Sequence, residues 1–99
     1  MYVKIHKTEK GTIIAACDDE LIGKVITDGN KYMDLKKYGD FYKGEKTTEE
    51  NLAKLLKGSF NSMNLVGKNV VSVAITTGII GQNDVMYING TPYIQIYSV

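Results

Sequence analysis

The fold of this 99-residue chain is decided by the stretch Asn64-Leu65-Val66-Gly67-Lys68-Asn69-Val70-Val71-Ser72-Val73-Ala74-Ile75-Thr76-Thr77-Gly78-Ile79-Ile80, its longest apolar-rich segment. We interpret Lys68 to Thr77 as a helix that ends at Gly78, because glycine takes the left-handed conformation without a Cβ clash. The apolar stripe of this helix, at the i, i+3, i+4 spacing, consists of Val70, Val71, Ala74 and Ile75. The alternative is a strand, because Val71, Val73 and Ile75 alternate and β-branched residues favour sheets.

A second helix is predicted over residues 48–57. Thr47 and Glu50 have the spacing of a capping box, and Gly58 follows the last turn. Its narrow apolar stripe consists of Leu52, Leu55 and Leu56. Because each helix is apolar on one side only, both are expected to pack on another layer.

The first of three predicted hairpins joins residues 2–6 to residues 12–17 through Thr8-Glu9-Lys10-Gly11. If paired residue numbers sum to 19, Val3 opposes Ala16 and Ile5 opposes Ile14 on one apolar face. The opposite face then carries Lys4, His6 and Cys17.

Turn residues indicate two further hairpins. Asp28-Gly29-Asn30 would join a strand at 24–27 to a strand at 31–35. Asn89-Gly90 would join a strand at 85–88 to a strand at 91–97. In the last hairpin the core face is expected to carry Val85, Tyr87, Pro92, Ile94 and Ile96. The sequence therefore predicts an α+β fold for a single domain, residues 1–99. In this two-layer sandwich, a mostly antiparallel, hairpin-built sheet packs against two main helices.

Composition narrows the function classes. Twelve basic and eleven acidic residues give a net charge of +1, which is not the basic excess of a dedicated nucleic-acid binder. The single cysteine, Cys17, excludes an internal disulfide, which suits a reducing compartment, and we expect a cytoplasmic protein. The N-terminus lacks a signal-peptide pattern, and no run is long enough to cross a bilayer, so a membrane role is not expected.

Four short segments carry a family resemblance: Asp18-Asp19-Glu20-Leu21-Ile22-Gly23-Lys24, Phe41-Tyr42-Lys43-Gly44-Glu45, Asn64-Leu65-Val66-Gly67 and Asn89-Gly90-Thr91-Pro92-Tyr93. With them, nearly the whole chain resembles the archaeal family called domain of unknown function 424. The resemblance implies an archaeal cytosolic protein with a compact α/β fold, in the general setting of information processing. It implies no assigned activity, and it transfers no catalytic residue.

One candidate site is acidic. Asp18, Asp19 and Glu20 are the residue types that bind a hard cation or act as acid and base, and His6 with Cys17 would add an imidazole and a thiol. The competing interpretation is an exposed acidic helix cap and a buried structural cysteine. Two Cys and His side chains are too few for structural zinc, so no metal or cofactor is predicted.

The other candidate site is aromatic, since seven of the nine aromatic residues are tyrosines. Tyr93 and Tyr97 share the second face of the last hairpin with Met86, a surface that could stack bases or hold a partner. Lys68 and Asn64 are added as polar contacts, and Lys4, Lys31 and Lys68 are expected to gather around phosphates. The competing interpretation is that a helix covers this face too.

These observations favour a small binding module, an accessory to RNA or translation machinery, acting as a monomer or weak homodimer. Its expected partners are RNA or a translation-related protein. The alternative function is a small enzyme or metal-dependent site built from the Asp18-Asp19-Glu20 cluster with His6 and Cys17.

Overall fold

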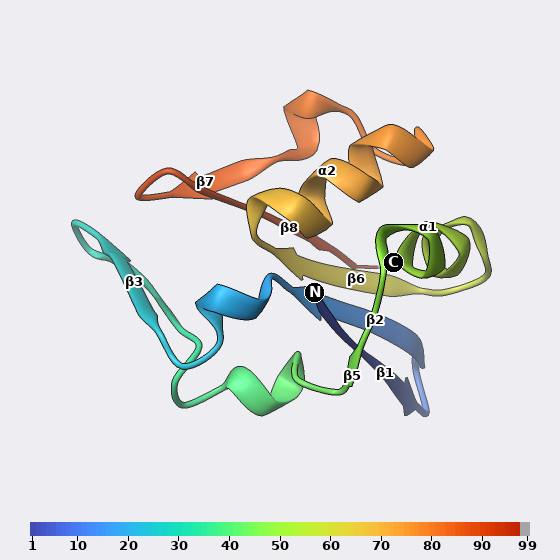
Figure 1. Cartoon of the computed structure of the whole chain (residues 1–99), viewed down its shortest axis with the longest axis horizontal. Coiled ribbons are helices and arrows are strands. Elements are labelled where there is room, and N and C mark those ends of the chain that lie inside the picture. The colour runs from blue at the N-terminus through green and yellow to red at the C-terminus, as the bar shows by residue number, and fades with distance from the viewer. Residues whose placement is uncertain (98–99) are drawn as a thin grey trace.

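The computed structural model describes residues 1–97, whose helices and strands are shown in Figure 1. Within these residues the main sheet has the strand order β5-β1-β2-β6-β8-β7, and a separate small sheet pairs β3 with β4. The strands are β1 Tyr2–Thr8, β2 Gly11–Cys17, β3 Val25–Asp28, β4 Lys31–Asp34, β5 Glu45–Lys46, β6 Ser62–Val66, β7 Met86–Ile88 and β8 Thr91–Ile96. The helices are α1 Glu49–Lys57 and α2 Lys68–Thr77, with single 3₁₀ turns η1 Asp19–Leu21, η2 Gly39–Phe41 and η3 Gln82–Asp84. The predicted α+β class is confirmed.

The central apolar stretch forms the predicted helix, and the strand alternative is wrong. α2 covers Lys68–Thr77, and Gly78 ends it in the left-handed conformation with φ of +82°. Val70, Val71 and Ala74 are buried as expected. Before the helix, Gly67 has a φ of +117°, a value that side-chain-bearing residues rarely adopt. This glycine separates α2 from a strand directly upstream.

That strand, β6, was not predicted. It lies in the middle of the main sheet, parallel to β2 and antiparallel to β8. Met63 and Leu65 face the helices, while Asn64 and Val66 face the other side, and all four are buried. A strand that is buried on both faces has no apolar–polar alternation, so the period-2 test misses it. The parallel pair needs a long crossover connection, which residues 18–61 supply.

The three predicted hairpins are present. In β1–β2 the paired residue numbers sum to 19, with Val3 opposite Ala16 and Ile5 opposite Ile14. β3 and β4 pair Asp28 with Lys31 across the expected turn. In β7–β8, the Asn89-Gly90 turn has φ of +46° and +78°, as a type I′ turn requires.

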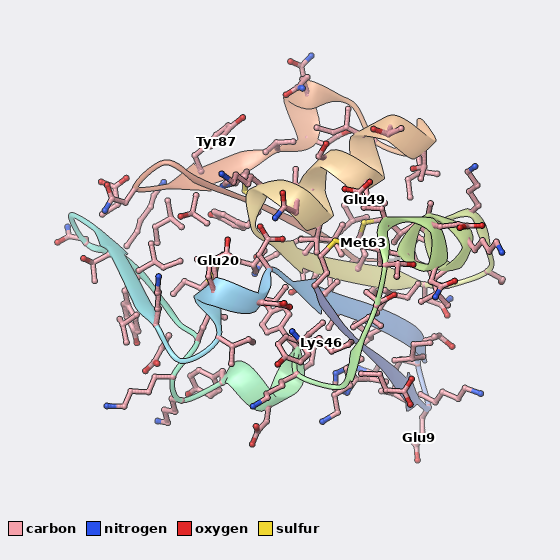
Figure 2. The ribbon with its side chains drawn as sticks, viewed as in Figure 1. Glu9, Glu20, Lys46, Glu49, Met63 and Tyr87 are labelled. Atoms are coloured by element: carbon pink, nitrogen blue, oxygen red, sulfur yellow. The ribbon has the colours of Figure 1, made fainter. Side chains whose placement is uncertain are left out.

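The main sheet carries a core on each face, and the two helices cover one of them (Figure 1). The helix-side core consists of Ile14, Ala16, Leu52, Leu56, Met63, Leu65, Val70, Val71, Val73, Ala74, Ile80 and Ile94. Figure 2 labels Met63, which points from β6 toward the helices. The loop-side core consists of Ala15, Cys17, Leu35, Tyr42 and Val66, which the connection from β2 to β5 covers. The second face of the sheet is therefore partly buried by a loop region rather than by a helix.

The cap of α1 differs by one residue from the prediction. Thr48, and not Thr47, is the N-cap, and its hydroxyl accepts a hydrogen bond from the Asn51 N–H at 3.2 Å. The backbone N–H of Thr47 instead donates to the Met1 carbonyl beside β5. The N-cap is therefore the residue after Thr47, and the predicted capping box of Thr47 with Glu50 does not form.

We expect Thr48→Ala to lower the free energy of unfolding by about 1 kcal/mol, because an N-terminal N–H of α1 loses its acceptor. Thr47→Ala is the matched control, since the hydroxyl of Thr47 makes no bond to the helix N–H groups. Urea unfolding of both variants measures the difference. An equal loss in the two variants would contradict the assigned cap.

Candidate functional site

Near the end of β8, on the side of the sheet opposite the helices, Tyr97 lies over Asn64 within the described residues 1–97. Tyr97 follows this strand and is 62% exposed, whereas Asn64 on β6 is only 5% exposed. The Tyr97 hydroxyl donates to Asn64 Oδ1 at 3.4 Å. Within residues 1–97 this is the one hydrogen bond we find for the Asn64 side chain, and it uses the amide oxygen rather than the NH₂ group.

A shallow pocket lies beside the Tyr97 ring. Its volume is about 250 Å³, and Thr8, Lys10, Gly11, Ile13, Asn61, Ser62 and Tyr97 line it. We name the surface made by Lys10, Ile13, Ser62, Asn64 and Tyr97 the tyrosine face. The strand pairing places Ile13, Ser62 and Asn64 on the side of the sheet that faces away from α1 and α2.

The connection between β2 and β5 determines where this face ends. At the other end of the same side, the loop-side core buries Cys17 and Val66, and Tyr93 packs against it. Tyr42 lies at the boundary, where burial raises the pKa of its phenol to about 12, with smaller contributions from Cys17 and Tyr97. The tyrosine face therefore lies beyond the part of this side that the loop-side core covers.

An aromatic row borders the tyrosine face. Phe41 stacks on His6 with ring centroids 4.3 Å apart, and it meets the edge of Tyr42 at 5.2 Å. His6 Nε2 is 2.8 Å from the Phe41 carbonyl oxygen, which holds η2 against β1. The row links β1 to η2 through residues far apart in the sequence.

The five predicted site residues are only partly brought together. Tyr97 and Asn64 are in contact. Tyr93 pairs with Met86 and is half-buried, while Met86 is 41% exposed. Lys68 lies at the start of α2, beside the turn between β7 and β8.

The predicted lysine cluster does not form around Tyr97. The Lys4 ammonium donates to the Asp40 carbonyl on η2 at 2.9 Å. Lys31 lies opposite Asp28 in the β3–β4 strand pair, at the tip of the small sheet. In Figure 1, that tip and β1 lie on opposite sides of the molecule, and Lys68 lies on a third element, α2. Lys10, in the predicted turn of the first hairpin, is the lysine that lines the pocket next to Tyr97.

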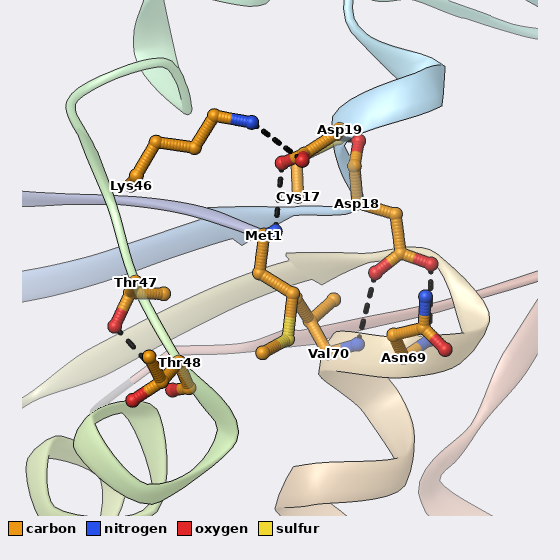
Figure 3. A network of polar contacts seen from close by, with 9 residues as sticks. All are labelled: Met1, Cys17, Asp18, Asp19, Lys46, Thr47, Thr48, Asn69 and Val70. Carbon is orange, nitrogen blue, oxygen red and sulfur yellow. Dashed lines mark hydrogen bonds and ion pairs between the residues drawn. The ribbon is translucent and has the colours of Figure 1, made fainter.

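The prediction that Asp18 is part of an exposed helix cap is wrong, because Asp18 is a buried cap of α2. Its side chain is buried, and it accepts hydrogen bonds from the N–H groups of Asn69 and Val70, each at 3.0 Å, at the start of α2 (Figure 3). Burial raises the pKa of this carboxyl, and the two N–H bonds oppose that rise. Its backbone N–H also donates to the Val66 carbonyl at 3.0 Å. Asp18 therefore joins β2, β6 and α2.

Asp19 points away from Asp18 and makes different contacts (Figure 3). Its carboxylate binds the N-terminal ammonium of Met1 at 2.7 Å and the Lys46 ammonium at 2.5 Å. The hydrogen bond from Lys46 and then that from the N-terminus hold the pKa of Asp19 below its usual range. The neighbouring carboxylates do not converge, and within residues 1–97 we find no group of three His, Cys, Asp or Glu side chains suited to a metal ion.

Cys17 and His6 share a sheet face, as predicted, but they do not meet. Cys17 is opposite Tyr2 and His6 is opposite Ile13, which separates them by about 13 Å along the strands. Burial, followed by the charges of Asp18, Glu20 and Asp19, raises the pKa of the Cys17 thiol to about 12. The thiol is therefore protonated at neutral pH and unsuited to attack.

The sequence did not predict that Phe41 stacks on His6 or that Lys10 lies beside Tyr97. The available signal was the aromatic pair Phe41-Tyr42 between Gly39 and Gly44, a pattern that by itself indicates a loop held in place by its aromatic side chains. That interpretation is supported, since Tyr42 is buried. Its further consequence, an aromatic row on the sheet, depends on the packing of η2 against β1.

Comparison with known proteins gives a family and a fold. A family model described as "Protein of unknown function (DUF424)" matches residues 5–99. No curated protein matches the chain. The crystal structure of an uncharacterized conserved protein from Methanopyrus kandleri is similar to it, with a TM-score of 0.82 and 20% identity over 99% of this chain and 90% of the other. In residues 1–97 no helix is long and apolar enough to span a membrane.

Proposed function

The chain belongs to the DUF424 family of proteins of unknown function, and we propose from its own geometry that it is a non-enzymatic module that binds single-stranded RNA on the tyrosine face. The observation that carries this proposal is the exposed Tyr97 ring, held at its hydroxyl by the buried Asn64. In this proposal the protein acts in the cytoplasm as a monomer or weak homodimer, as an accessory to RNA or translation machinery.

The chemistry of the face suits an unpaired base. An exposed aromatic ring stacks on any base, and each such contact contributes about 1 to 3 kcal/mol. The Asn64 side chain lies at the hydroxyl of Tyr97, and in this proposal its NH₂ group donates to an acceptor on the edge of a base. Sequence-specific recognition of RNA uses unstacked bases of this kind.

The charges suit a short contact with the backbone. Lys10 lines the pocket beside Tyr97, and the chain carries a net charge of only +1. Each phosphate neutralised on a single strand changes the slope of log affinity against log salt by about 0.7. One or two lysine contacts therefore predict a shallow dependence of RNA affinity on salt.

We expect Tyr97→Ala to weaken the binding of a labelled single-stranded RNA by about 5- to 150-fold, the equivalent of one lost stacking contact. Tyr97→Phe keeps the ring and should retain most of the affinity. Fluorescence anisotropy at low salt, with RNA of mixed sequence and with oligouridine, measures both. Tyr87→Ala is the matched control, because Tyr87 is 55% exposed and lies on β7 away from the tyrosine face (Figure 2).

Three results would contradict this proposal. The first is an unmodified protein that retains neither RNA nor a ribosomal fraction at low salt. The second is an equal loss of affinity in Tyr87→Ala and Tyr97→Ala. The third is unchanged affinity in Tyr97→Ala with its fold intact. Tyr93→Ala is not a suitable test, because Tyr93 packs against the loop-side core and its loss should reduce stability.

A further inference from the structure

The turn between β7 and β8 contains the pair Asn89-Gly90, and Asn89 is the one asparagine of this chain that is followed by glycine. An asparagine side chain loses ammonia when the backbone nitrogen of the next residue attacks its carbonyl carbon, which makes asparagine a thermolabile residue. A following glycine favours this attack, because it has no Cβ to obstruct the approach of its nitrogen. The sequence therefore distinguishes Asn89 from the other asparagines of the chain.

The turn leaves both reacting groups of this pair exposed and unbonded within residues 1–97. Ile88 pairs with Thr91 across the turn, so the strand pairing does not use the Gly90 N–H. In this part of the chain we find no hydrogen bond to the Gly90 N–H or to the Asn89 side chain. Both residues are exposed, and a Cβ added to Gly90 would have no neighbouring atom within 4 Å. The approach to the Gly90 nitrogen is therefore open.

Other asparagines provide standards for the rate. The side-chain oxygen of Asn61 accepts the Thr12 N–H at 2.8 Å, and its own N–H donates to the Thr12 carbonyl at 2.9 Å, so this side chain is fixed. Asn30 and Asn83 are exposed, as Asn89 is, but a lysine and an aspartate follow them. A faster reaction at Asn89 than at Asn30 and Asn83 would thus reflect the glycine and the turn rather than exposure alone.

Asn89 also links the small sheet to the main sheet. Its backbone N–H donates to Asp28 Oδ2 at 3.0 Å, and Asp28 is the last residue of β3. Figure 1 shows the tip of the β3–β4 hairpin beside the turn between β7 and β8. Toward the other end of the small sheet, Ile26 and Met33 pack against the loop-side core. A change at Asn89 would therefore act on the tip of the small sheet.

We propose that Asn89 is a site of spontaneous deamidation and that its conversion releases the tip of the β3–β4 hairpin from the main sheet. The Gly90 nitrogen bonds to Cγ of Asn89, which closes a succinimide ring. The side-chain nitrogen leaves as ammonia and carries away the proton of the Gly90 N–H. Water then opens the ring at either carbonyl, which yields aspartate or isoaspartate. The site lies at the opposite end of β8 from Tyr97, so the proposal is independent of the RNA site.

Both products place a new negative charge next to the Asp28 carboxylate. In isoaspartate the chain continues through the side-chain carbons, so the free α-carboxylate is attached to the Cα whose N–H donates to Asp28. The two like charges repel each other. The main chain of the turn also gains one carbon, which disturbs its type I′ geometry. The bond to Asp28 should therefore weaken, and the tip of the small sheet should open more often.

Peptide mass spectrometry of the purified full chain tests the modification. During incubation, Asn89 should acquire the mass of the acid several times faster than Asn30 and Asn83. The reaction should be faster at mildly alkaline pH than at neutral pH, because the attack requires loss of the Gly90 N–H proton. Equal rates at Asn89 and at the two exposed asparagines would overturn the proposed site.

Hydrogen exchange tests the release of the small sheet. The amides of β3 and β4 should exchange faster in the incubated protein and in Asn89→Asp than in the fresh protein, while those of α2 stay unchanged. Asn89→Gly is the matched control, since glycine tolerates the φ of +46°, keeps the N–H that binds Asp28 and has no amide to lose. It should exchange as the fresh protein does, before and after incubation. If incubated protein and Asn89→Asp exchange in β3 and β4 as Asn89→Gly does, the release is overturned.

Discussion

Replacement of Ala74 by aspartate is expected to unfold the protein. Ala74 has no exposed surface and lies on α2 within the helix-side core. A carboxylate at this position would be buried without a partner, at a cost of several kcal/mol, which is comparable with the whole stability of a small domain. Loss of the helical circular dichroism signal and of a cooperative thermal transition would measure this effect.

Ser72→Asp provides the control, because Ser72 is an exposed residue of the same helix. This variant adds the same charge without burying it, so its thermal transition should stay close to that of the parent. If Ala74→Asp melts at the temperature of Ser72→Asp, α2 does not pack on the sheet through Ala74.

Asp18→Ala is expected to lower the free energy of unfolding by about 2 to 4 kcal/mol. The carboxylate accepts the N–H groups of Asn69 and Val70, and alanine would leave these N–H groups at the start of α2 without an acceptor. A negative charge at a helix N-terminus is also favourable to the helix dipole, and alanine removes it. Chemical denaturation with a constant m-value would measure the change.

Asp19→Ala is the matched control for Asp18→Ala. Asp19 is the adjacent acid, but its ion pairs with Met1 and Lys46 are at the surface, where such pairs contribute little. We therefore expect a much smaller loss of stability than for Asp18→Ala. Equal losses in the two variants would show that the α2 cap does not depend on the Asp18 carboxylate.

Gly67 explains why this cap can form. A Cβ at this position would lie 2.6 Å from Asp18 Oδ2, and φ at Gly67 is +117°. Only glycine therefore lets the end of β6 turn into α2 while the carboxylate of Asp18 lies against the backbone. The segment Asn64-Leu65-Val66-Gly67, one of the four that carry the family resemblance, is the junction between β6 and α2.

Local patterns in the sequence were sufficient for elements whose stability depends on nearby residues. The end of α2 at Gly78 and the register of the β1–β2 hairpin were predicted correctly. Of the predicted α2 stripe, Val70, Val71 and Ala74 are buried and Ile75 is partly buried, while Val73 is buried without having been predicted. Each depends on side-chain spacing or turn conformation within about a dozen residues, and such preferences act before distant segments meet. The α+β class followed from the number and order of these elements.

Long-range packing decided the rest. β6 became a central strand because β2 and β8 pair with both of its edges and cores bury both of its faces, so no local alternation identified it. The prediction that Asp18 is a surface cap failed because α2 begins 51 residues after the end of β2 and yet lies beside it in space, where it buries Asp18. Long-range packing also places Tyr93 against the loop-side core and the hydroxyl of the exposed Tyr97 on Asn64. It brings the rings of His6, Phe41 and Tyr42 into one row. The sequence alone determined which residues can form strands, turns and helices. Only the tertiary structure decided which polar groups are buried and which aromatic rings are exposed, because both depend on contacts between segments that are distant in the chain.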